Sequence, residues 1–98
     1  MKIEKANDGT VMTVELIGEV DASNASKIEA DLLNEIVGVK DLTFDLAELE
    51  YISSTGLRIL LLMQKMMKAQ GSMTIKNVRK DVMDIFRVAG FVRLLNIV

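Results

Sequence analysis

The first twenty residues form two short runs in which apolar and polar side chains alternate. The run "KIEKAN" alternates weakly, and "VMTVELIGEV" places Met12, Val14 and Leu16 on one face. Between them lies "NDG" at residues 7–9, and an Asp-Gly pair flanked by alternating runs is a strong signal of a hairpin turn. We therefore predict two antiparallel strands at the start of the chain.

The segment "DASNASKIEADLLNEIVG", residues 21–38, has the apolar spacing of an amphipathic helix. Gly38 ends it. Three residues at its start are suitable N-caps: Asp21, Ser23 and Asn24. The apolar residues that recur at helical intervals are Ile28, Leu32, Leu33 and Ile36. The sequence thus predicts a helix with one buried and one polar face.

A second predicted helix follows Gly56 and ends at Gly71. Its apolar arc is broader than one face buried on a sheet needs. Leu62 and Met66 fall beside Arg58 on the helix surface, outside the narrowest buried stripe. They either pack under another element of the core or form a surface for a partner, since methionine suits adaptable contacts.

The remaining segments continue the alternation of strands and helices. "DLTFDLAEL" predicts a strand that leads directly into "YISSTGL", and "SMTIKNV" predicts another core strand. "RKDVMDIFRVAG" predicts a short helix, and "VRLLNIV" a last strand. The inward side chains of that helix are Val82, Ile85, Phe86 and Ala89. This order predicts an α/β sandwich with a mixed sheet.

Length and composition set the class of protein. The 98 residues suit a single domain over 1–98, and half of them are hydrophobic, enough for a core. The chain has no cysteine and no histidine, which removes disulfides, thiolate metal sites and the commonest general base. The longest apolar run, 59–63, is far too short to span a bilayer, and the charged N-terminus lacks a signal-peptide core. We expect a soluble cytoplasmic protein that needs no cofactor or metal and binds no membrane.

Charge is divided unevenly along the chain. Residues 1–49 carry four basic and eleven acidic side chains, whereas residues 50–98 carry eight basic and three acidic. The two halves either balance each other when they pack or present an acidic and a basic side to partners. No basic cluster with interleaved aromatic residues exists, so we expect no nucleic-acid partner.

The hydroxyl cluster Ser53, Ser54 and Thr55 lies where a strand turns into a helix. The first N–H groups of a helix are unpaired and favour negative charge. A phosphate on one of these hydroxyls could be received there without loss of the fold, yet it would add nearly two negative charges for a partner to meet. The cluster is therefore either a plain helix cap or a phosphorylation switch. Asp21, at another strand-to-helix junction, is in the first instance a cap for its own helix.

Catalytic motifs are missing from the sequence. It contains no G-x-S-x-G element, no Walker-type phosphate loop and no G-x-G-x-x-G fingerprint. Without histidine or a lysine within the motif, a hydrolase that uses Ser54 has no base. We expect a binding protein and no enzyme.

"FDLAELEYISSTGLRILL", residues 44–61, resembles the signature of STAS domains, specifically the single-domain anti-sigma factor antagonists of bacteria. "VELIGEVDASNASKIEADL" resembles the family's second strand, turn and first helix, and "KDVMDIFRVAGFVRLLNIV" its later helix and strand. Essentially the whole chain is covered. The resemblance implies a STAS-like α/β sandwich with a mixed sheet and helices packed mainly on one face.

The resemblance also implies a function by partner switching. Such proteins bind an anti-sigma factor, usually a serine kinase, and thereby release a sigma factor. The kinase inactivates them by phosphorylating a serine, and a metal-dependent phosphatase of the PP2C type restores them. Laid on this sequence, the modified serine is Ser54, although Ser53, where the family often has aspartate, leaves a second hydroxyl beside it. The implied partner-binding residues are Asp21, Ser53, Thr55, Gly56 and Leu57.

One alternative from the same family stays open. Some members are never phosphorylated and bind partners constitutively, as scaffold modules in a signalling complex or as ligand-sensing subunits. The sequence names neither the sigma factor nor the kinase, and it leaves open whether the chain dimerises through Leu62 and Met66.

Overall fold

The polar turn at residues 7–9 joins two antiparallel strands, which confirms the predicted hairpin. In the computed structural model, which describes all residues 1–98, β1 (Lys2–Lys5) pairs with β2 (Val11–Glu15). Gly9 takes a positive φ of 76°, and the Asp8 carboxylate accepts hydrogen bonds from the amide and hydroxyl of Thr10. So short a turn is closed by a glycine in the left-handed region and by a side chain that accepts hydrogen bonds from the residue two positions later.

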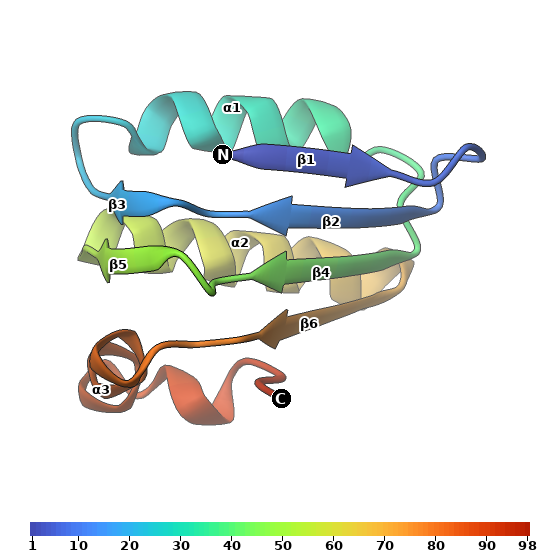
Figure 1. Cartoon of the computed structure of the whole chain (residues 1–98). Helices are drawn as coiled ribbons and strands as arrows, with labels where there is room; N and C mark the ends of the chain where they lie inside the picture. The colour runs from blue at the N-terminus through green and yellow to red at the C-terminus, as the bar shows by residue number, and fades with distance from the viewer.

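A mixed four-stranded sheet forms the centre of the molecule, as predicted (Figure 1). Its order is β1-β2-β4-β6, where β4 (Asp41–Asp45) and β6 (Ser72–Lys76) run parallel to β2. Alternation places one set of side chains in the core: Met12, Val14, Leu42, Phe44, Met73 and Ile75. The opposite set includes a row of threonines in register, Thr13, Thr43 and Thr74, and covers the face that carries no helix.

Two runs that the sequence analysis treats as continuous strands are each broken in the structure. The end of the first run forms β3 (Gly18–Val20), which pairs in parallel with β5 (Leu49–Ile52), a strand that begins only at the last residue of the second run. Gly18 at φ 74° redirects the first run, and a turn closed by Leu49 N–H to Leu46 O redirects the second. Both predictions of a single strand were therefore wrong, because local turns override the alternation of side chains.

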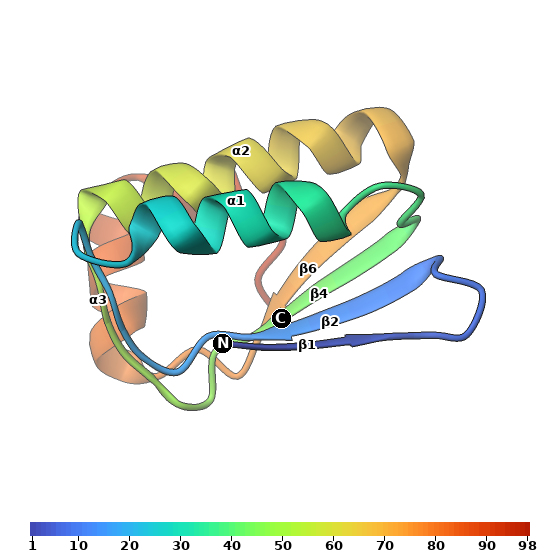
Figure 2. The same cartoon turned by 90° about the horizontal axis from the view of Figure 1, so that it is seen from above.

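Helices α1 (Ala25–Glu35) and α2 (Ser54–Gln70) lie side by side over one face of the sheet (Figure 2). The Gln70 side-chain amide donates to the carbonyls of Ile36 and Val39, at 2.9 and 2.7 Å, and so fastens the end of α2 to the end of the α1 segment. The shorter α3 (Lys80–Val88) lies beside β5 at the end of the sheet. The predicted placement of helices mainly on one face is confirmed.

The broad apolar arc of α2 is explained by burial. Leu60, Met63 and Met67 are fully buried, and Leu62 and Met66 are partly buried against the same core. Of the two alternatives for Leu62 and Met66, packing in the core is the one that the structure supports.

The structure also contains no helix whose length and apolar character would let it span a bilayer.

The end of the chain departs from the prediction. "VRLLNIV" forms no strand: the 3₁₀ turn η1 (Phe91–Arg93) follows Gly90, which has a left-handed conformation, and only Ile97 makes a parallel bridge, with Ile75. Ala89, predicted to point inward, is exposed because α3 has already ended at Val88. Val82 and Phe86 are buried as predicted, and Ile85 is half-buried.

Candidate functional site

The parallel pairing of β3 with β5 brings two distant turns to the same edge. Val20 is in register with Ile52, and the Ser53 amide donates to the Val20 carbonyl at 2.8 Å. Asp21 and Ser53, the residues that follow each strand, are consequently neighbours at the C-terminal ends of the two strands. In α/β sheets this end commonly carries the functional site, because the loops there converge.

Ser53 is the N-cap of α2. Its backbone is extended, with φ −86° and ψ 176°, and its hydroxyl oxygen accepts a hydrogen bond from the Gly56 amide at 3.4 Å. The same oxygen lies 2.6 Å from the Thr55 hydroxyl. Two of the three hydroxyls in the cluster are therefore engaged with each other and with the helix, which is the capping role.

Ser54 is the hydroxyl that remains free. The helix begins at Ser54, and not after Gly56 as the sequence analysis expects, so this residue stands at the first helical position. Its side chain is exposed and forms no hydrogen bond, while Ser53 and Thr55 are half-buried. The first turn contains no acidic residue, so the positive end of the helix dipole is not neutralised there.

Gly56 allows α2 to begin this close to the strands. A Cβ at this position would lie 2.5 Å from Cγ1 of Ile52 and 2.8 Å from Cγ1 of Val20, which is closer than side-chain carbons approach. Gly56 and Leu57 are both buried. The family resemblance implies that both bind the partner, but in the free protein they offer no exposed side chain. Their contribution is to hold the turn in position.

Asp21 organises the turn before α1 and does not cap the helix itself. Its carboxylate accepts hydrogen bonds from the Ser23 hydroxyl and from the Ser23 amide, the latter at 2.9 Å. The N-cap position is held by Asn24, which makes no side-chain cap. Asn24 instead accepts from the Asp21 amide at 3.0 Å and donates to the Glu19 carbonyl at 2.8 Å. The carboxylate of Asp21 therefore stabilises the turn that precedes α1, and the expected capping of the helix itself is not observed.

The bonds to Ser23 predict how acid affects this turn. The Ser23 hydroxyl, and then the Ser23 amide, lower the pKa of Asp21 below its usual value. A lowered pKa in the folded state contributes stability above about pH 4, the unfolded value, and that stability is lost as the pH falls through the folded pKa. Asp21→Asn should therefore be less stable than wild type at pH 7, and the two melting temperatures should converge below pH 4. Melting curves recorded from pH 7 to pH 2 test this, and a constant difference across that range would contradict it.

A shallow depression of about 120 Å³ lies between α1 and α2 beside the turn. Its lining comprises Ala25, Ser26, Glu29, Thr55, Arg58 and Ile59. Sequence reasoning did not single out Glu29, because only the packing of the two helices brings it beside Thr55. No group of acidic side chains in the molecule is arranged to hold a metal ion.

Comparisons with known proteins find a matching family model, a relative in sequence and solved structures of the same fold. The model of the STAS domain family matches residues 2–98. A Bordetella bronchiseptica protein named "Putative anti-sigma factor antagonist BtrV" is 35% identical over 81 residues, which cover 81% of this chain and 70% of that protein.

Solved structures share the fold. The unphosphorylated anti-sigma factor antagonist SpoIIAA superposes with a TM-score of 0.84 at 19% identity, covering 99% of this chain and 86% of that one. An anti-sigma factor antagonist from Mycobacterium paratuberculosis superposes with a TM-score of 0.85 at 18% identity, covering 98% and 81%. SpoIIAA in its phosphorylated form superposes with a TM-score of 0.75 at 18% identity, covering 99% and 89%.

Proposed function

Because the chain belongs to the STAS domain family, we propose that it is an anti-sigma factor antagonist switched by phosphorylation of Ser54. Its unphosphorylated form binds an anti-sigma factor of the serine-kinase type and so frees a sigma factor. STAS anti-sigma factor antagonists are regulators that catalyse no reaction. The chemistry of the switch is supplied by the partner kinase, and a PP2C-type phosphatase reverses it in the cytoplasm.

The observation that carries the proposal is the state of Ser54. It is the one hydroxyl of the cluster that is exposed and free of hydrogen bonds, at the first position of a helix without an acidic residue in its first turn. A kinase can reach it, and the free amides of that turn can receive the added phosphate. The phosphate brings nearly two negative charges to the surface. The fold is kept and the surface that a partner meets is changed.

The partner-binding surface is proposed around this serine. Asp21 and Thr55 are half-buried and lie at the same edge, and Ser53 joins them through its bond to Thr55. Gly56 and Leu57 support this surface from beneath.

The first test is a phosphorylation assay. The protein is incubated with ATP and the anti-sigma kinase encoded in the same genome, and the site is mapped by mass spectrometry, with Ser54→Ala as the control. We expect one phosphate on Ser54 and none on the variant. Phosphate on Ser53 or Thr55 would keep the switch and correct the residue. Binding without any phosphorylation would instead favour a constitutive scaffold or ligand-sensing module.

A further inference from the structure

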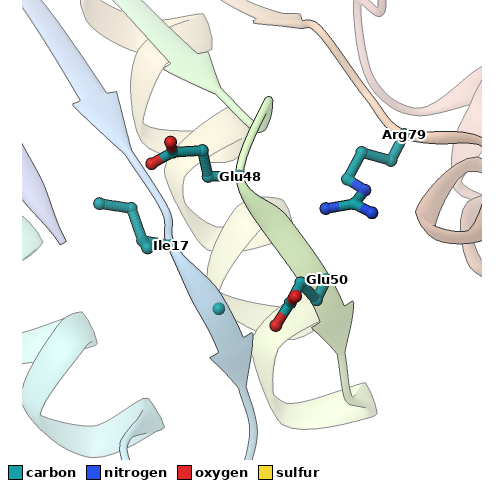
Figure 3. A pocket seen from close by; sticks show the side chains of 5 residues that line it. Ile17, Glu48, Glu50 and Arg79 are labelled. Carbon is teal, nitrogen blue, oxygen red and sulfur yellow. The ribbon is translucent and has the colours of Figure 1, made fainter.

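The outer face of the β3–β5 pair carries an open hollow of about 370 Å³ that the proposed switch does not use (Figure 3). Ile17 contributes from the link between β2 and β3, Glu48 and Glu50 from β5 and the turn before it, and Arg79 from the start of α3. Gly18 completes the lining. The space beside it is open, since a Cβ at this position would have no atom within 4 Å.

Two exposed apolar side chains occur on this face. Ile17 is 41% exposed, and Tyr51, which stands in register with Glu19 on the neighbouring strand, is 45% exposed. In a protein interface, accessible apolar side chains of this kind can serve as anchors once the partner excludes water.

The charge of the same face is negative. Glu19, Glu48 and Glu50 are all exposed. Arg79 makes no ion pair with any of them within 4.0 Å; its Nε lies 4.0 Å from Asp81 instead, so that carboxylate takes up part of its charge. Three exposed glutamates thus outnumber the one arginine on this face. A surface of this kind attracts a basic partner.

Size gives a second reason to extend the proposed interface to this face. Stable protein complexes bury about 800 Å² on each partner. The turn around Ser54 offers only a few exposed side chains, and the depression between α1 and α2 is smaller than the β3–β5 hollow. The outer face is continuous with the switch, because β3 and β5 lead directly into Asp21 and Ser53.

We infer that this hollow is a second docking surface for the anti-sigma partner, which places basic side chains over Glu48 and Glu50 and an apolar side chain on Ile17. The inference rests on the proposed function, since the partner is the same. It adds the chemistry of the partner's contact: a basic surface with an apolar anchor. Phosphorylation of Ser54 would act beside this contact without removing it.

The test compares two double charge reversals in binding to the purified anti-sigma kinase. Glu48→Lys/Glu50→Lys should lower the affinity about tenfold or more, chiefly through slower association, and should flatten its dependence on salt. The control, Glu4→Lys/Asp41→Lys, makes the same change of charge at exposed positions away from the hollow and should change the affinity less than twofold. Ile17→Ser tests the apolar anchor and should speed dissociation, whereas Val37→Ser, at a side chain 76% exposed, should not.

The outcomes separate the inference from the function on which it rests. No binding by the wild type would overturn the proposed function and this surface with it. Binding that Ser54→Asp weakens but Glu48→Lys/Glu50→Lys does not would overturn the surface alone, as would equal losses in the control. Should the lysine variant fail to fold, Glu48→Gln/Glu50→Gln removes the same charges with little change of shape, and unchanged affinity in that variant would overturn the surface.

Discussion

Replacing Ser54 by aspartate should lower the affinity for the anti-sigma partner by at least about 100-fold, equivalent to about 2.7 kcal/mol. The reason is local. Ser54 is exposed at the first position of α2, so the new carboxylate stands on the surface that the partner covers. A charged side chain placed in an interface loses its hydration, and the partner has no opposite charge positioned to pair with it. Such mismatches cost several kcal/mol of binding free energy. Titration of the partner by calorimetry measures the change directly.

The fold should survive this substitution. The first turn of α2 has no acidic residue, and a carboxylate at a helix N-terminus is stabilising by about 0.3–1 kcal/mol. We therefore expect the melting temperature of Ser54→Asp to equal or slightly exceed that of the wild type. A large loss of stability would mean that weaker binding reflects unfolding, and the switch would then need another test.

Ser53→Asp is the matched control, since it adds the same charge one residue earlier. Ser53 is half-buried at the N-cap, where its oxygen accepts from the Gly56 amide, and an aspartate can accept the same hydrogen bond. The family signature that this sequence resembles often has aspartate at that position. Ser53→Asp should therefore lose clearly less affinity for the partner than Ser54→Asp, even though Ser53 belongs to the proposed partner-binding surface. If Ser54→Asp binds as tightly as the wild type, or if both variants lose binding equally, the switch at Ser54 is refuted.

Local signals in the sequence predicted most elements of the fold. The Asp-Gly turn, the helical spacing before Gly38 and the stop at Gly71 each act within a few residues, and each is present in the structure. The errors occur where a tertiary contact or a single backbone angle determines the local structure. Gly18 breaks one predicted strand by its positive φ, and the predicted last strand is reduced to one bridge at Ile97. Alternation of side chains alone cannot distinguish these cases.

The site shows the same division. The hydroxyl cluster could be located from sequence because strand, turn and helix are adjacent in the chain. The sequence could not show which hydroxyl is free of hydrogen bonds, because that depends on the 2.6 Å contact between Ser53 and Thr55. The approach of Asp21 to this turn depends on the register of β3 with β5, and the hollow at Ile17 and Glu48 depends on two strand breaks that the sequence analysis did not foresee.

Gly56→Ala should destabilise the protein by about 1–3 kcal/mol, the usual cost of overpacking a well-packed site. On an open helix the same change would stabilise by up to about 1 kcal/mol, because alanine has the higher helix propensity. The contacts reverse the sign here: the new methyl group would lie 2.5 Å from Cγ1 of Ile52 and 2.8 Å from Cγ1 of Val20. Denaturant unfolding measures the difference. Ser54→Ala, two residues earlier at an exposed position, is the control and should change stability by less than about 0.5 kcal/mol.

A double-mutant cycle separates a steric conflict from a general weakness of this helix turn. Ile52→Ala alone should cost about 2–5 kcal/mol, because it leaves a cavity in the core. Combined with Gly56→Ala, the methyl group at position 56 can occupy part of that space, so the double variant should be more stable than the sum of the two losses predicts, by about 0.5–3 kcal/mol. Strict additivity would show that the two side chains do not compete, and the close approach of α2 to β5 would then not be what requires glycine. The close approach of α2 to β5 also determines the position of Ser54. Gly56 permits the helix to begin against the strands, and the start of the helix sets where the Ser54 hydroxyl meets solvent.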